Sequence, residues 1–391
     1  MLSLQRKRIL IASNGHKGVL RPSEACAAIA EGLAGIDAEL SCVPMADGGD
    51  GLIEALSASL PGEVEPITVR DSLFRPRRAR LALLKTSAGR TAVIEMADAA
   101  GSAILEPHER QTMVATSYGV GEMILEAIAR GYRRVIVGLG GGITSDCGMG
   151  LAQALGVQFI GRDGKILRPI CNQGFNALSL LDVDGVRLDG LRIDLNQVDI
   201  LVSADVDTPL LGPRGQAATF GPQKGANAAE IAYLEHGLAN VADVVRRCLG
   251  REVDVPMAGA AGGMAAGLVG FFGARLRLGA EVVSDELDLS RKIRESGLLV
   301  VGEGKMDPST FHRKSPHYLA EIAAAAEIPV VAVVGVVEQR AACFDAIYAE
   351  EEDGNLNGEA ARRRLRKAAL RLKSDIIRCT TSNHHEKATY Q

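Results

Sequence analysis

The sequence predicts an α/β protein of two domains, in which buried parallel strands alternate with helices. The first observation is length, because 391 residues correspond to about two domains at roughly 100–200 residues each. The second is the alternation of short apolar, β-branched runs with segments of helical period. The third is composition, since 44 glycines and 4% aromatic residues are typical of α/β enzymes whose tight turns surround small ligands.

The first half of the chain alternates between strand and helix signals, with a turn signal inside a meander. In order, the predicted elements are a strand (8–13), a helix (23–33), two meander strands (79–84 and 91–96) with a turn at 88–89, a helix (116–130), a strand (135–139) and a helix (148–155).

The second half contains the clearest helix, over 228–249, where apolar residues recur at steps of three and four. Strands are predicted at 200–204, 298–301 and 329–334, and the last two are the near-continuous apolar runs of strands covered on both faces. The two ends of the chain resemble βαβ units and the middle resembles a meander. This pattern fits a second domain inserted into the first.

Composition excludes several classes of protein. A net charge of −4 gives no electrostatic reason to bind nucleic acid or anionic lipid. The seven cysteines contain no C-x-x-C pair, which argues against a zinc site and a disulfide scaffold. We expect free thiols in a reducing cytoplasm. No signal peptide and no membrane span are predicted, because residues 1–8 lack an apolar segment and no apolar run reaches about 18 residues.

The C-terminal segment carries an acidic run at 350–353 and then seven Arg and Lys residues between 362 and 373, on a predicted helix. The preferred interpretation is a solvated helix face, and the alternative is contact with an acidic partner. Residues 380–391 are expected to form a frayed end.

A glycine-rich segment at 138–150 is the strongest local signal for a ligand. A strand leads into Gly140, Gly141 and Gly142, then Thr144, and then a helix. Consecutive glycines let backbone N–H groups converge on an anion, and the helix N-terminus adds positive potential. Neither a Walker A motif nor G-x-G-x-x-G occurs. The alternative is a tight turn with a capped helix and no ligand. A second glycine segment, 259–267, permits either phosphate approach or close helix packing.

Acidic residues follow three predicted strands, at 46–51, at 205–207 and at 302–307. Ligands of open α/β sheets bind outside the carboxyl ends of the strands, where carboxylates can hold Mg²⁺ or accept a hydroxyl proton. Taken singly, each residue is more often a turn former. Four lysines in Gly/Pro-rich surroundings can neutralise phosphate: Lys17, Lys224, Lys305 and Lys314.

In this order, the segments resemble the bacterial glycerate kinases of type 1. The resemblance runs from about residue 8 to about residue 348, and the segments that carry it are ADGGDG (46–51), IEMADAAG (94–101), SYGVGE (117–122), 138–156, 204–226, 259–267 and GEGKMD (302–307).

The resemblance implies a flavodoxin-like domain formed by residues 1–62 and 286–391, with a restriction-endonuclease-like α/β domain inserted at 63–285. It implies ATP-dependent phosphorylation of D-glycerate with Mg²⁺, at the 2-hydroxyl more than the 3-hydroxyl. A monomer or a homodimer is the expected assembly. The residues that match the family motifs are Lys17, Asp47, Asp146, Asp205, Asp207, Lys224, Glu303, Asp307 and Lys314.

Physical roles follow from what phosphoryl transfer needs, which is charge neutralisation and alignment. Asp307, Asp47 and Lys17 are the predicted catalytic residues, with Asp307 or Asp47 deprotonating the attacking hydroxyl. Asp205 and Asp207 are predicted to hold Mg²⁺. The predicted phosphate and nucleotide contacts are Gly140, Gly141, Gly142, Thr144, Lys224, Gly262 and Gly263.

Two loops depart from the family pattern. Ser-Asn-Gly-His-Lys at 13–17 replaces Pro-Asp-Ser-Phe-Lys, and a Gln after Asp307 is lost. We expect added positive charge from His16, His312 and Arg313, which favours a larger or more acidic hydroxy acid than glycerate. Tolerated drift and a catalytically silent ligand-binding relative are the alternatives. The predicted substrate-pocket residues are Asn14, His16, Glu303, Lys305, His312, Arg313 and Lys314.

Overall fold

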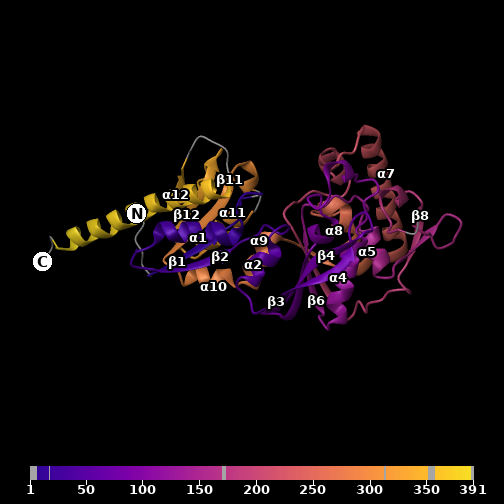
Figure 1. Cartoon of the computed structure of the whole chain (residues 1–391), viewed down its shortest axis with the longest axis horizontal. Coiled ribbons are helices and arrows are strands. Elements are labelled where there is room, and N and C mark those ends of the chain that lie inside the picture. The colour runs from indigo at the N-terminus through magenta and orange to yellow at the C-terminus, as the bar shows by residue number, and fades with distance from the viewer. Residues whose placement is uncertain (1–6, 17, 170–172, 312–313, 351–356, 389–391) are drawn as a thin grey trace. The chain divides into compact units, whose positions relative to one another are not determined.

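The computed structural model describes residues 7–16, 18–169, 173–311, 314–350 and 357–388 (Figure 1). The chain divides into two compact units. The first unit comprises Met1–Asp47, Glu54–Leu60 and Gly279–Gln391, and the second comprises Gly48–Ile53 and Pro61–Leu278. The predicted α/β class with parallel strands is confirmed. The expected boundaries and the restriction-endonuclease-like type of the inserted domain stay predictions.

The first unit is built on a parallel sheet of order β13-β12-β11-β1-β2. Numbered within the unit, this is the flavodoxin-like order 2-1-3-4-5, whose direction switches between β1 and β11. Register is fixed by pairs such as Ile9↔Leu298 and Ile11↔Val300. The strands are β1 (Arg8–Ser13), β2 (Glu39–Pro44), β11 (Leu298–Met306), β12 (Val330–Val337) and β13 (Ala346–Ala349).

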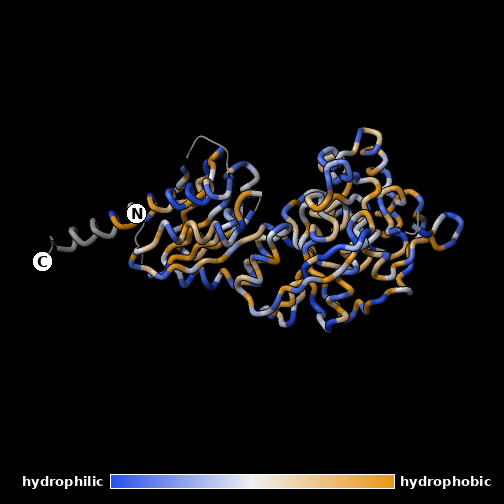
Figure 2. Tube along the Cα trace, in the orientation of Figure 1, coloured by the Kyte–Doolittle hydropathy of each residue, from blue (hydrophilic) through white to orange (hydrophobic). Residues whose placement is uncertain are grey.

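Helices cover both faces of this sheet, which explains the continuous apolar runs of its strands (Figure 2). On one face, α1 (Pro22–Leu33) packs against α12 (Gly358–Ala388). On the other, α11 (Ser315–Ala325) contacts β11 and β12 together with α9 (Gly279–Glu286) and α10 (Leu289–Arg294). The short elements are α2 (Leu52–Ser57), which continues from the second unit into the first, and the 3₁₀ turn η5 (Pro308–Phe311).

The C-terminal helix α12 belongs to the core of the first unit. Leu365, Ala369 and Leu372 are fully buried against α1 and the sheet. A Cβ on Gly32 of α1 would lie 2.5 Å from Ala369 Cβ, so the two helices approach at backbone distance. The predicted solvated face is also present, since Arg362 pairs with Glu31 at the surface. The frayed end expected at 380–391 is wrong for most of its length, because α12 extends to Ala388.

The second unit is built on a six-stranded sheet of order β10-β9-β6-β5-β4-β3. The strands β10, β9, β6 and β5 are parallel, and β4 and β3 continue the sheet as the predicted antiparallel meander. The strands of this unit, including a separate β7-β8 ribbon, are β3 (Gly62–Arg70), β4 (Pro76–Thr86), β5 (Gly89–Glu95), β6 (Arg134–Leu139), β7 (Gln158–Gly161), β8 (Val183–Arg187), β9 (Asp199–Ala204) and β10 (Arg275–Leu278).

The helix predicted at 228–249 is confirmed as α7 (Ala228–Leu249). Asn227 begins it by accepting hydrogen bonds from the N–H groups of Ala229 and Glu230, and Gly250 ends it with φ at 66°. The other helices and 3₁₀ turns are α3 (Ala97–Ala100), η1 (Pro107–Glu109), α4 (Tyr118–Ala129), α5 (Met149–Ala154), η3 (Ala177–Ser179), α6 (Gln216–Phe220), η4 (Pro222–Lys224) and α8 (Ala260–Phe272). Within the described part of the chain, no helix is long and apolar enough to cross a bilayer.

Candidate functional site

The carboxyl edge of the first unit's sheet gathers several of the predicted residues. Asn14 follows β1, Asp47 lies three residues after β2, and Glu303 lies on β11. The backbone N–H of Asn14 donates to Gly302 O at 2.8 Å, which joins the ends of β1 and β11. This is the topological switch point of the sheet, where ligands of flavodoxin-like folds bind.

The Asp47 carboxylate is held between two loops that are distant in sequence. Its Oδ2 accepts from Asn14 Nδ2 at 2.8 Å. Its Oδ1 accepts from Ser315 N at 2.8 Å and from Ser315 Oγ at 2.6 Å. These three hydrogen bonds fix the orientation of the carboxylate and tie the start of α11 to the loops after β1 and β2.

Glu303 is a carboxyl group buried within this edge, with 5% of its surface exposed. Burial, reinforced by the nearby carboxylates of Asp47 and Asp307, raises its pKa to about 8. A hydrogen bond from Thr310 and the cation of Lys314 oppose that shift without cancelling it. Near neutral pH, Glu303 therefore exchanges a proton far more readily than an exposed carboxylate does.

His16 corrects one expectation from the sequence. It is 3% exposed, and a Cβ added to Gly304 or Gly335 would lie 3.2 Å from its Cα or 3.0 Å from its Cε1, respectively. Burial lowers its pKa to about 4, so the ring is neutral at pH 7. The positive charge expected at His16 is wrong, because the ring is packed against the ends of β11 and β12.

The remaining pocket candidates are less concentrated at this edge. Lys305 pairs with Glu338 at 2.6 Å, and both side chains are about half exposed. Lys314 is the N-cap residue of α11, and Asp307 lies between β11 and η5. The predictions for Lys17, His312 and Arg313 lie outside the described residues.

In the second unit, the glycine-rich loop follows β6 at the carboxyl edge of the sheet. The backbones of Gly140 and Gly49 touch, since a Cβ on Gly140 would lie 2.8 Å from Gly49 Cα. Gly141 has φ at +63°, and a Cβ there would lie 3.0 Å from Asp50 Oδ1. Only glycine combines these approaches with a left-handed backbone. Asp205 follows β9 at the same edge, because Ala204 pairs with Leu139.

Lys224 is a buried cation beneath this loop. Its Nζ donates to the Thr144 carbonyl at 2.6 Å. Burial lowers its pKa to about 8, and the carboxylate of Asp146 acts in the opposite direction. The Thr144 hydroxyl is buried, with no hydrogen-bond partner among the described residues. A cation and an unpartnered hydroxyl thus lie at the buried end of the predicted phosphate loop.

Asp146 organises the backbone after the loop. Its carboxylate is fully buried and accepts from Ser117 N at 2.8 Å, Ser117 Oγ at 2.7 Å, Gly148 N at 3.1 Å and Gly150 N at 3.2 Å. Burial raises its pKa and these four donors oppose that shift. The helix expected at 148–155 begins at Met149, so the Thr-Ser-Asp run is a loop that Asp146 holds together.

Gly262 and Gly263 pack against this loop. Both are buried, with φ at +73° and +80°. A Cβ on Gly262 would lie 1.9 Å from Thr144 O, and one on Gly263 would lie 3.3 Å from Cys147 Cα. The close-packing alternative therefore accounts for both glycines without a phosphate contact.

We expect Gly262→Ala to lower the free energy of unfolding by about 3–5 kcal/mol, because a left-handed alanine costs about 1–2 kcal/mol and the buried clash adds to it. Gly250→Ala is the matched control, since φ is +66° there with nothing within 4 Å. It should cost only about 1–2 kcal/mol. Urea unfolding of both variants measures the difference, and equal losses would show that the contact with Thr144 is unimportant.

Asp205 and Asp207, the predicted Mg²⁺ ligands, are both exposed just beyond β9. Among the residues that the structure describes, no group of three or more His, Cys, Asp or Glu side chains is arranged to hold a metal. Such a donor set still fits Mg²⁺, which usually keeps several waters and binds one or two carboxylates together with substrate phosphates.

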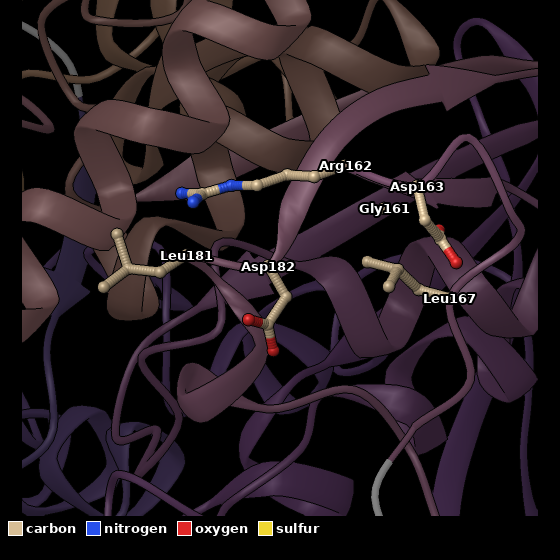
Figure 3. Close-up of a pocket in the computed structure, with 6 residues that line it drawn as sticks. All are labelled: Gly161, Arg162, Asp163, Leu167, Leu181 and Asp182. Carbon is tan, nitrogen blue, oxygen red and sulfur yellow. The ribbon is translucent and has the colours of Figure 1, made fainter.

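A surface pocket of about 410 Å³ lies elsewhere in the second unit, beside the β7-β8 ribbon (Figure 3). Arg162 and Asp163 extend in different directions there (Figure 3). None of the predicted site residues lines the pocket, whose lining is Gly161, Arg162, Asp163, Leu167, Leu181 and Asp182.

Sequence reasoning missed several polar residues that complete the two groups. Thr310 donates to Glu303, Ser315 donates to Asp47, and Ser117 donates to Asp146. Ser145 Oγ accepts from Thr112 Oγ1 and from Gln216 Nε2. The only available signal was adjacency to predicted motifs, because Thr310 and Ser315 lie in the segment that follows Asp307.

Known proteins similar to this chain agree with one another. The model of the glycerate kinase family matches residues 9–371. Glycerate 2-kinase of Escherichia coli K12 is 37% identical over 87% of this chain and 90% of its own length. Glycerate kinase of Bacillus subtilis 168 is 35% identical over 85% of this chain and 86% of its own.

A solved structure matches over almost the whole chain. It is the crystal structure of a Salmonella typhimurium LT2 protein described as a glycerate kinase 2, with a TM-score of 0.85, 33% identity, and coverage of 96% of this chain and all of that one. The fold and the sequence comparisons therefore lead to the same assignment. The chain belongs to the glycerate kinase family.

Proposed function

We propose that this chain transfers the γ-phosphoryl group of ATP to D-glycerate and forms 2-phosphoglycerate. Family membership supports the reaction, and the Escherichia coli relative, named a glycerate 2-kinase, supports the 2-position. The observation that carries the proposal is the pair of polar groups at the carboxyl edges of the two sheets. One edge carries buried and oriented carboxyl groups, and the other carries a glycine loop above a buried lysine.

We assign ATP to the second unit. Lys224 and the Gly140–Thr144 loop offer a cation and backbone N–H groups to its phosphates, as phosphoryl transfer requires. Asp205 and Asp207 would hold Mg²⁺, which neutralises phosphate charge when bound. The hydroxy acid is assigned to the first unit, where Asp307 and Asp47 are the catalytic candidates chosen from the sequence.

Glycerate is favoured over a larger or more acidic acid by the state of the loop after β1. His16 is neutral and packed on the sheet, so one of the three positive charges behind the alternative is removed. We place the reaction in the cytoplasm, which the free thiols of Cys26, Cys42, Cys147, Cys248 and Cys343 support. A homodimer stays a prediction.

The test is ADP release with Mg²⁺-ATP in the presence of D-glycerate, L-glycerate, tartronate, tartrate, threonate or erythronate. We expect turnover with D-glycerate and a ³¹P NMR signal of the 2-phosphate. Turnover only with another acid would support the altered-pocket alternative. Silence from folded protein across the panel would support a ligand-binding relative.

A further inference from the structure

Within the proposed kinase reaction, on which this inference rests, we propose that Glu303 is the general base that accepts the proton of the attacking hydroxyl. The sequence placed that role on Asp307 or Asp47 and gave Glu303 only a place in the substrate pocket. The geometry of the three carboxyl groups in the first unit points to Glu303.

Asp47 is poorly arranged to accept a proton. Both of its oxygens are already engaged, Oδ2 with Asn14 and Oδ1 with the N–H and hydroxyl of Ser315. Protonation of either oxygen would place a hydrogen against a donor that now points at it, and would weaken the tie between the two loops. We therefore assign Asp47 a positioning role, in which it orders the loop after β1 and the start of α11.

Glu303 is oriented by a directional chain of hydrogen bonds. The backbone N–H of Asp307 donates to Thr310 Oγ1 at 3.1 Å, and Thr310 Oγ1 donates to Glu303 Oε1 at 2.9 Å. Because a hydroxyl that accepts an N–H still has one proton to give, Oε1 is fixed as the acceptor. The exchangeable proton of Glu303 then belongs on Oε2, and this chain holds the carboxyl group in one orientation.

The surroundings suit proton exchange near neutral pH. The charged and titratable groups that face Glu303 are Asp47 after β2, Asp307 after β11 and Lys314 before α11, and His16 after β1 packs on the adjacent Gly304. With a pKa of about 8, Glu303 is a stronger base than an ordinary carboxylate, yet part of the population remains ionised at pH 7.

The proposed step balances as follows. The O–H bond of the acid's hydroxyl breaks, and the proton passes to the ionised Glu303 carboxylate. The hydroxyl oxygen forms a bond to the γ-phosphorus of ATP, and the bond between that phosphorus and the β,γ-bridging oxygen breaks to release ADP. Glu303 then returns its proton to water before the next turnover.

The test compares wild type with Glu303→Gln across pH 6–9.5, by kcat/KM for D-glycerate at saturating Mg²⁺-ATP. We expect a loss of about 10²–10⁴-fold. Because the base must be ionised, the ratio of wild type to variant should rise with pH and level off above about 8. The ratio is plotted because Lys224, with a pKa also near 8, is common to both proteins. Glu321→Gln, an exposed carboxyl on α11, is the control and should match wild type.

A second variant guards against misfolding of the first. Thr310→Val removes the hydrogen bond that lowers the Glu303 pKa, so the rising limb should move to higher pH, and Thr310→Ser should restore it. A structural role alone would not move this limb.

Three results would contradict the inference. An active Glu303→Gln with a flat ratio overturns it and leaves the proposed function intact. A ratio that falls above pH 8 would make Glu303 a proton donor to the bound acid instead of a base. A wild type silent with every acid at every pH overturns the proposed function, and the inference with it.

Discussion

Lys224→Met should lower kcat/KM for ATP by about 10²–10³-fold, the range expected when a charged donor is removed from a site where phosphate charge develops. Lys224 Nζ reaches the Thr144 carbonyl at 2.6 Å, at the end of the glycine loop assigned to phosphate. The substitution removes the cation and also the donor that holds the loop. Steady-state kinetics with ATP as the varied substrate measures the loss.

Two comparisons separate the roles of Lys224. Lys165→Met, at a lysine of the second unit whose side chain is 83% exposed, should leave kcat/KM unchanged. Because the pKa of Lys224 is about 8, its charge is lost above that pH, so wild-type kcat/KM for ATP should decline there. The decline should be absent from Lys224→Met. Normal kinetics together with a lowered melting temperature would make Lys224 a structural strap with no role in phosphate binding.

Asp146→Ala should lower the free energy of unfolding by about 3–5 kcal/mol, because buried donors left without an acceptor are costly. Four hydrogen bonds to this fully buried carboxylate connect the loop after β6 to Ser117 and to the start of α5. The change also removes the carboxylate that interacts with the Lys224 cation. Urea denaturation followed by circular dichroism measures the loss.

Asp146→Asn provides a graded comparison, because the amide keeps one acceptor oxygen and presents a donor to the other N–H groups. We expect a loss between those of the wild type and Asp146→Ala. Asp163→Ala, at a side chain 59% exposed in the same unit, should change stability by at most about 0.5 kcal/mol. Equal stability of all three variants and the wild type would mean that the hydrogen bonds of Asp146 do not hold the loop.

Much of the fold could be predicted from local sequence. The strand at 8–13 and the helix at 228–249 were predicted at their observed bounds, since apolar periodicity follows directly from which faces are buried. Strand ends were less accurate, as β11 continues to Met306 beyond the predicted 301. Polar residues interrupt the apolar run there while the backbone pairing with β12 continues.

The candidate site was predicted in its parts. The sequence selected Asp47, Glu303 and Lys224 because they follow strands or stand in glycine-rich loops, which is information carried by neighbouring residues. It did not reveal Ser315 as the partner of Asp47, because the two are 268 positions apart. Nor did it reveal that Gly262 lies against Thr144. Contacts between distant segments leave no periodic signal in either segment.

By itself, the sequence determined the α/β class, the order of the elements and the family, since each depends on local pattern or on motifs that stand in a fixed order. Only the tertiary structure decided the ionisation of the site. His16 is neutral and Glu303 titrates near pH 8, although both were chosen only as polar residues beside a strand. The physical reason is that a pKa depends on burial and on the charges nearby, and both are set by segments that meet only when the chain folds.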